Sequence, residues 1–134
     1  EDLVADIEKG STDGGTPLEI LDRSLRNHVS AIQQRKGISF QVVAEIISLG
    51  DKKLSRQASQ ALDAYTGRIK DVLSAGISAG QIRKDIDPEK AAILVAAALQ
   101  GLVSRWALSG YGFDLEKEYL SAWHLLREAV VRRE

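Results

Sequence analysis

Residues 85–134 read DIDPEKAAILVAAALQGLVSRWALSGYGFDLEKEYLSAWHLLREAVVRRE. The spacing of apolar residues predicts two consecutive helices, one that begins within Asp85–Glu89 and runs to about Ser109, and one that begins within Phe113–Glu116 and runs to the end of the chain. Apolar residues cover more than one side of each helix, and such a helix must be enclosed by a larger core or by another chain. A chain of 134 residues offers little to enclose both, so we expect a second copy to cover one side.

Length and composition predict a single globular domain over residues 1–134. Charged residues make up 28% and apolar residues 44%, which is close to the globular average. The net charge is -1 without a basic cluster, which argues against a nucleic-acid-binding surface in this stretch. The absence of cysteine excludes disulfides and thiolate metal sites, and it fits a cytoplasmic protein.

No membrane segment and no signal peptide are expected. The longest apolar run, Ala91–Leu99, has nine residues, far fewer than the ~20 that cross a bilayer. The sequence starts at Glu1 and contains no methionine, so we expect it to be part of a longer protein.

The chain is predicted to be all-α, a bundle of about five to six helices. Helix start signals, apolar stripes and glycine breaks divide it into short and long helices. The expected helices span residues 1–9, 17–36, 39–49, 52–79, 88–109 and 115–134.

Local signals support these boundaries. Thr16 and Glu19 form a predicted capping box before the second helix, and Gly37 ends that helix. Ser39 is the expected cap of the next helix, with Ile38 able to pack on Val43 as a hydrophobic staple.

The helix over 52–79 carries one long apolar stripe, from Leu54 to Ile77. Gly67 and Gly76 lie within it and are expected to weaken it locally, each by about 1 kcal/mol relative to alanine. Gly80 is the expected stop.

The last helix has two neighbouring stripes. One stripe can pack on the chain's own bundle, and it comprises Leu115, Tyr119, Ala122, Leu126 and Ala129 or Val130. The other needs a partner, and it comprises Leu120, Trp123, Arg127 and Val131, with His124 beside them.

Three short motifs follow one another in the second half of the chain. They are GQIRKDIDPE at residues 80–89 after a long helix, GL at 101–102 followed by RWA at 105–107, and FDL at 113–115 at the start of the last helix. In this order and spacing the sequence resembles the C-terminal, ligand-sensing domain of the TetR/AcrR transcriptional regulators. The resemblance covers residues 52–134, and before residue 52 only the number and length of the helices agree.

The resemblance implies a homodimer that binds a small effector and controls a separate N-terminal helix-turn-helix domain. It also implies that the last two helices of each subunit form an intersubunit four-helix bundle, a role that falls on Ala91–Ser109 and Leu115–Arg132. The sequence departs from the family pattern because the helix-turn-helix is absent. Operator DNA would therefore be bound only through the missing N-terminal domain.

Gly101 lies mid-helix in apolar surroundings, where glycine is unfavourable unless another backbone approaches closely. We interpret it as a helix contact across the dimer, the alternative being a tolerated glycine. Trp123 is the better interface candidate of the two tryptophans, although core packing is an equal alternative for both. The predicted dimer interface comprises Leu94, Ala98, Gly101, Leu102, Arg105, Leu120, Trp123, His124, Arg127 and Val131.

The resemblance also places an effector pocket among the long helix, the helices before it and the first dimer helix. For each residue singly, packing in the core is the stronger alternative. His28, Tyr65 and Gln100 are the candidates to orient a largely apolar ligand. The predicted effector-binding residues are Phe40, His28, Tyr65, Ile69, Leu73, Leu99, Gln100, Val103 and Trp106.

Catalysis is not expected. The two histidines, His28 and His124, are not in a metal-ligand spacing, and we expect neither a metal nor a cofactor.

The sequence therefore predicts the sensing and dimerisation domain of a TetR-like repressor, whose small-molecule effector it does not identify. A helical homodimeric module without a ligand is the alternative, and a helical-bundle enzyme is the third.

Overall fold

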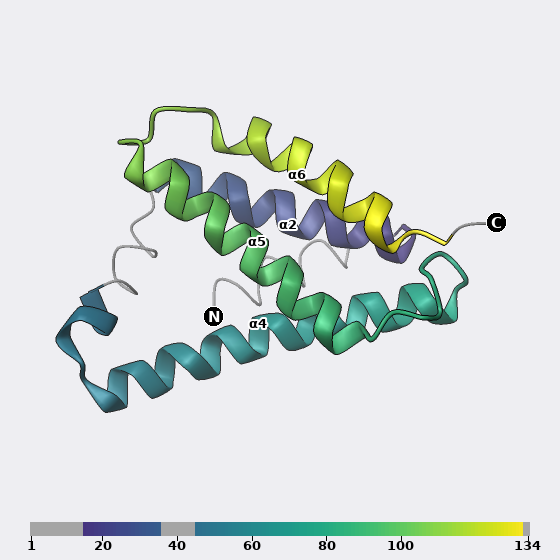
Figure 1. Cartoon of the computed structure of the whole chain (residues 1–134), viewed down its shortest axis with the longest axis horizontal. Helices are drawn as coiled ribbons and strands as arrows, with labels where there is room; N and C mark the ends of the chain where they lie inside the picture. The colour runs from purple at the N-terminus through teal and green to yellow at the C-terminus, as the bar shows by residue number, and fades with distance from the viewer. Residues whose placement is uncertain (1–14, 36–44, 133–134) are drawn as a thin grey trace.

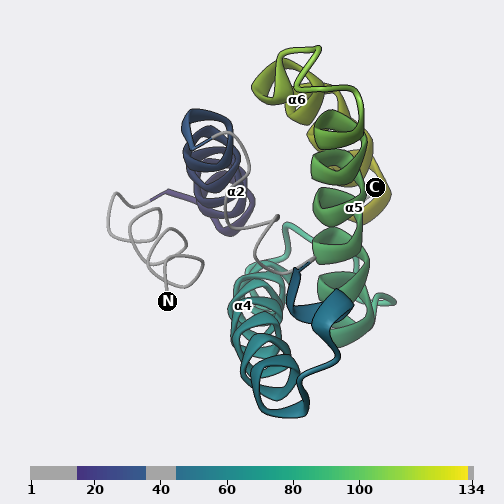
Figure 2. The same ribbon diagram turned by 90° about the vertical axis from the view of Figure 1, so that its left-hand side faces the viewer.

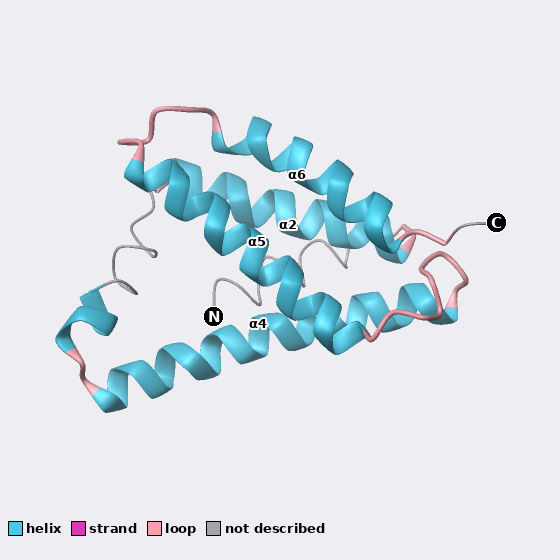
Figure 3. Cartoon of the chain, viewed as in Figure 1, coloured by secondary structure: helices cyan, strands magenta, loops and turns pink. Residues whose placement is uncertain are grey.

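The computed structural model describes residues 15–35 and 45–132. Every long secondary-structure element in these residues is a helix, as predicted (Figures 1 and 3). They are α2 (Pro17–Gln34), α4 (Lys52–Ser78), α5 (Pro88–Leu108) and α6 (Leu115–Val130). Residues 45–49 are also helical. The all-α prediction is confirmed, and the four long helices begin at the predicted residues or within the predicted starting stretches.

The four long helices form a ring in which each contacts two neighbours. α4 packs on α2 and α5, and α6 packs on the same two helices from the other side. Figure 2 shows α2 on one side and α5 on the other, with α4 below and α6 above. The N-terminal part of α4 extends beyond the other helices (Figure 1).

The core fills the centre of this ring. Each helix contributes apolar side chains spaced three or four residues apart, so the predicted stripes face inward. The core comprises Leu18, Leu21, Leu25, Val29, Tyr65, Ile69, Leu73, Ile82, Ala92, Val95, Leu99, Val103, Trp106, Leu115 and Tyr119.

Side chains cap the N-termini of the helices. The predicted capping box is confirmed: the Glu19 N–H donates to Thr16 Oγ1 at 3.3 Å, and Glu19 Oε1 accepts from the Thr16 N–H at 2.9 Å. Hydrogen bonds from the backbone and side chain of Thr16 lower the pKa of the Glu19 carboxyl. Asp51, Asp87 and Asp114 cap α4, α5 and α6 through their side-chain carboxylates.

The loop between α4 and α5 ties three helix ends together. Gln81 Oε1 accepts from the Leu18 N–H at 2.8 Å and thereby caps α2. The backbone N–H of Arg83 donates to the Val130 carbonyl at 2.9 Å, and Nη1 of Arg83 donates to the Ala129 carbonyl at 3.2 Å, both at the end of α6. Arg83 also pairs with Asp85 at 2.9 Å, which lowers the pKa of that carboxyl.

The prediction that the last helix continues to the end of the chain is wrong. α6 ends at Val130, and Val131 adopts an extended conformation in an isolated antiparallel bridge with Ile82. The Arg132 N–H donates to the Gln81 carbonyl at 2.9 Å. After Val130 the backbone therefore pairs with the loop between α4 and α5 and does not continue as a helix.

The stripe on α4 is buried over only part of its length. Tyr65, Ile69 and Leu73 are buried, whereas Leu54 and Leu62 are each 38% exposed. The predicted apolar stripe is thus buried only in the C-terminal half of α4, because the N-terminal half lies beyond the ring.

Gly76 has a structural role that the sequence analysis missed. It is buried, and a Cβ atom there would overlap the side chain of Ile82. Its carbonyl accepts from the N–H groups of Gln81 and Ile82 at 2.9 and 3.1 Å. The glycine lets the loop fold back onto α4.

Several predictions lie outside the described residues. They concern the helix over 1–9, the cap at Ser39, the staple of Ile38 on Val43, and Phe40.

Candidate functional site

α5 presents three different faces. One face packs in the core through Ala92, Val95, Leu99, Val103 and Trp106. A second face lines a groove against α4, and a third is exposed although largely apolar. The apolar residues of α5 therefore lie on more than one face. The first face is buried in the core, and the third is exposed in the described part of the chain.

The third face of α5 has a regular spacing. Leu94 is 63% and Leu108 is 88% exposed, while Ala98, Gly101 and Arg105 are also exposed. Successive members are four, three, four and three residues apart, which is the spacing of a helix seam that packs against another helix. We call these five residues the α5 seam. Five of the predicted interface residues lie on α5, and four of them belong to it; the fifth, Leu102, is half-buried.

Gly101 is open on the side of the seam. A Cβ atom at this position would meet no atom of the described chain within 4 Å. No close approach by the described residues therefore explains this glycine, and a contact with another chain stays the prediction for it.

The predicted interface residues of α6, together with Val131, which follows this helix, divide into two groups. Leu120, His124 and Arg127 are exposed, Leu120 by 46%. Trp123 and Val131 are half-buried and pack against the chain's own core. The first group is thus exposed, as predicted for a stripe that needs a partner. The Trp123 side chain instead packs against the core of its own chain.

Six of the predicted effector-binding residues lie in the core. Each is at most 5% exposed, and their side chains pack against those of α2 and α6. They are Tyr65, Ile69, Leu73, Leu99, Val103 and Trp106. A ligand contacting them would need space that their own packing now fills.

Trp106 illustrates this packing. Its indole N–H donates to the Phe113 carbonyl at 3.0 Å and secures the turn between α5 and α6. The ring of Tyr111 lies edge-on to it with centroids 4.8 Å apart. Tyr111 has a φ of 61°, a left-handed conformation unusual for a residue other than glycine.

His28 and Tyr65, two of the three predicted polar contacts, lie together. Their ring centroids are 5.2 Å apart at the contact between α2 and α4. Gln100, the third, is exposed on the groove face of α5. The structure therefore joins two of the three residues and separates the third.

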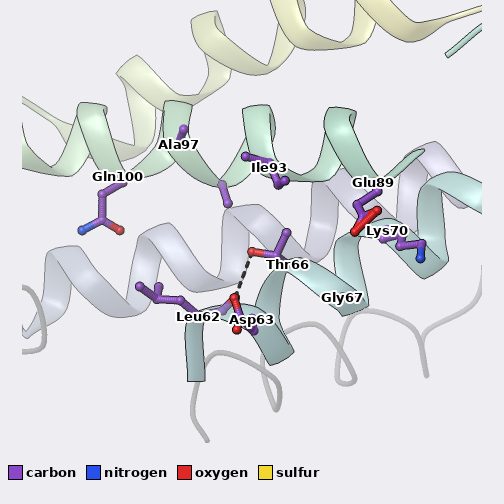
Figure 4. Close-up of a pocket in the computed structure, with 10 residues that line it drawn as sticks. Leu62, Asp63, Thr66, Gly67, Lys70, Glu89, Ile93, Ala97 and Gln100 are labelled. Carbon is purple, nitrogen blue, oxygen red and sulfur yellow. Dashed lines mark hydrogen bonds between the residues drawn. The ribbon is translucent and has the colours of Figure 1, made fainter. Parts of the chain in front are cut away.

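The groove between α4 and α5 has a volume of about 680 Å³ (Figure 4). Its lining comprises Leu62, Asp63, Thr66, Gly67, Lys70, Glu89, Ile93, Ala96, Ala97 and Gln100. Of these only Gln100 was predicted from the sequence. The sequence signal that was available is the set of small residues Gly67 on α4 and Ala96 and Ala97 on α5, all of which line the groove.

Tyr119 connects α6 to α2 beside the core. Its hydroxyl donates to Asp22 Oδ1 at 2.9 Å and lies 3.2 Å from the Asp22 carbonyl oxygen. Burial and the neighbouring carboxylate raise the pKa of the Tyr119 hydroxyl, so the phenol stays protonated as a donor. Asp22 also pairs with Arg26 at 2.6 Å.

Within residues 15–35 and 45–132, no three His, Asp or Glu side chains are grouped as a metal site would require. By length and composition, one helix in that part, α5, could cross a membrane, although core helices of soluble proteins meet the same criterion. Only 28% of its most apolar 18-residue stretch is buried within the chain. The α5 seam is thus a largely apolar surface that the described residues leave exposed.

A family model described as "YsiA-like protein, C-terminal region", a TetR C-terminal model, matches residues 1–129. No curated protein and no solved structure matches the chain.

Proposed function

The chain belongs to the TetR family of transcriptional regulators as a C-terminal domain, and on that premise we propose that it dimerises and senses a small molecule for a repressor. This C-terminal family is not an enzyme family. The proposal covers the homodimer, the effector and the direction of regulation.

The exposed α5 seam is the observation that carries the proposal. Stable soluble proteins seldom leave such a contiguous apolar surface uncovered, and a symmetric partner presents the same surface in return. Gly101 lies at the middle of the seam, where a missing side chain allows two helices to approach closely. Leu120, His124 and Arg127 extend the surface onto α6. Two helices from each subunit would then form a four-helix bundle.

The same helix supports the proposed sensing mechanism. α5 contributes to the core, to the groove and to the seam. A ligand that displaces α5 relative to α4 would therefore change how the two subunits meet. An effector acts in this way only if it binds two subunit arrangements with different affinity. The subunit arrangement would set the separation of two upstream DNA-reading domains, and thereby operator binding.

A soluble, cytoplasmic dimer is the proposed explanation of the apolar helix. Regulators of the TetR family are soluble. A membrane would leave the charged side chain of Arg105, in the last turn of α5, within an otherwise apolar seam. A second subunit can pair or solvate that guanidinium at the edge of the bundle.

Operator release by the full-length protein is the test. Gel-shift titrations with the protein's own promoter region would be run with and without a panel of metabolites that shift the melting temperature of this chain. We expect at least one stabilising compound to weaken operator binding. A compound that strengthens operator binding would show that the protein is not a repressor released by its effector.

The dense packing of the six interior candidates favours one alternative, a homodimeric module without a ligand. In that case the full-length protein would bind its operator equally well with every compound that binds this chain. The seam would still form the dimer.

A further inference from the structure

Gly67 points to a function for the groove between α4 and α5. It lies in the interior of α4, where glycine destabilises a helix relative to alanine. Unlike Gly76, it is not required by a close contact, because a Cβ atom there would meet nothing within 4 Å in the described structure. Gly67 lines the groove on the α4 side (Figure 4), and its missing side chain leaves space there.

The walls of the groove are mostly apolar. Leu62 comes from α4, and Ile93, Ala96 and Ala97 come from α5. Ile93 is 50% exposed, so covering it would remove apolar surface from water. Between Glu89 and Gln100, the groove follows eleven residues of helix, about 16 Å at the α-helical rise. A ligand that covers the walls is therefore elongated.

The charged groups lie in two places. Figure 4 shows Lys70 and Glu89 together at one end of the groove, and Asp63 apart from them, beside Leu62 and Thr66. No ion pair involves Asp63 among the described residues. Two carboxylates and one ammonium give the lining a net charge of -1. Since Lys70 offsets Glu89 at the far end, the remaining negative charge lies at Asp63.

We propose that this groove binds an elongated amphipathic cation, with its apolar body along Ile93 and Ala97 and its positive end at Asp63. The inference rests on the proposed function, because it names the chemical class and the location of the effector. It also separates the effector from the interior, where Tyr65, Ile69 and Leu73 are buried in the core.

The groove adjoins the α5 seam. Ile93 and Ala97 line the groove, and Leu94 and Ala98, the next residue after each, belong to the seam. A ligand that moves these two turns of α5 therefore moves the seam with them. This adjacency gives the ligand a direct effect on the arrangement of the subunits.

The test uses three ten-carbon probes below their micelle-forming concentrations: decyltrimethylammonium, decanoate and 1-decanol. Binding to this chain would be measured by calorimetry, and the contact would be located by methyl NMR. We expect the cation to bind most tightly and to shift the methyl resonances of Ile93 and Ala97. Equal binding of the anion or the alcohol, shifts confined to Ile69 and Leu73, or no binding of the cation would overturn the proposal.

Matched variants locate the site. Gly67→Leu fills the floor and should weaken binding of the cation by about ten-fold or more, whereas Ala75→Leu, on the exposed side of the same helix, should not. Asp63→Asn should weaken the cation by about three-fold and leave the alcohol unchanged, with Asp71→Asn as its control. If Gly67→Leu unfolds the chain, Ala97→Leu blocks the opposite wall. If Gly67→Leu or Ala97→Leu and Asp63→Asn fold and still bind the cation with wild-type affinity, the proposed site is wrong.

The two proposals fail in distinguishable ways. If the cation does not bind the groove while another compound releases the operator from the dimer, only this inference is wrong. If the cation binds the groove but the full-length protein is monomeric or ignores every ligand, the proposed function is wrong and the groove remains a binding site.

Discussion

Gln81 and Leu18 lie 63 positions apart in the sequence, yet Oε1 of Gln81 accepts the backbone N–H of Leu18 at 2.8 Å. Nε2 of the same side chain donates to Thr16 Oγ1 at 3.0 Å. One amide thus caps α2 from the loop that leads into α5. Arg83 of the same loop also binds the end of α6. The loop between α4 and α5 is therefore hydrogen-bonded to both α2 and α6.

Replacing Gln81 by leucine should destabilise the fold. The change keeps the size of the side chain but leaves the Leu18 N–H and the Thr16 hydroxyl without this partner, at a cost of about 1–3 kcal/mol. Urea unfolding followed by circular dichroism measures the loss. Gln57→Leu, at an exposed position on α4, is the control and should change stability by less than about 0.5 kcal/mol.

Gly76 and Gly67 should respond to alanine in opposite ways. At Gly76 a Cβ atom overlaps Ile82, so Gly76→Ala should cost about 1–3 kcal/mol. At Gly67 nothing lies within 4 Å, so Gly67→Ala should stabilise the helix by about 0.5–1 kcal/mol. Thermal unfolding of the two variants side by side checks this. The same sign for both would contradict the positions of these glycines.

The capping box should make stability depend on pH. Hydrogen bonds from Thr16 lower the pKa of Glu19 in the folded state. Its contribution is therefore present above the pKa of the unfolded carboxyl and is lost as pH falls through the folded pKa. We expect the melting temperature to fall less in Glu19→Gln than in the wild type between about pH 5 and pH 3. Glu118→Gln, in the exposed first turn of α6, should behave like the wild type.

Removing the Tyr119 hydroxyl should loosen α6 from α2. Tyr119→Phe keeps the buried ring but removes the hydrogen bond to Asp22, at a cost of about 1–2 kcal/mol. Asp22→Asn retains an oxygen that can accept this hydrogen bond, so it should cost less. Denaturant unfolding of both variants compares them, and an equal loss would show that the charge of Asp22, rather than the hydrogen bond, holds the two helices together.

The sequence predicted the helices well because their starting signals are local. Thr16, Asp87 and Asp114 cap the backbone within three residues of themselves, so neighbouring residues are sufficient to recognise them. The end of α6 was predicted wrongly because it depends on Gln81 and Arg83, about fifty residues earlier in the chain. The role of Gly76 depends on Ile82 in the same way.

The candidate site was predicted less completely. Periodicity predicted a side of α5 left for a partner, and in the described part of the chain Leu94, Ala98, Gly101 and Arg105 are exposed. It did not reveal that Trp123 has cover on its own core, since that depends on how far α6 rotates against α2. The groove was missed because its walls come from two helices, and their crossing is fixed by the packing of the whole ring.

The oligomeric state of the chain tests the central claim, that a second copy covers the α5 seam. Sedimentation velocity should show a dimer for the wild type, and Gly101→Leu should shift it toward monomer because a leucine would keep the two helices apart. Ala75→Leu, an exposed position on α4, is the control and should remain dimeric. A monomeric wild type, or an unchanged dimer in folded Gly101→Leu, would contradict the claim.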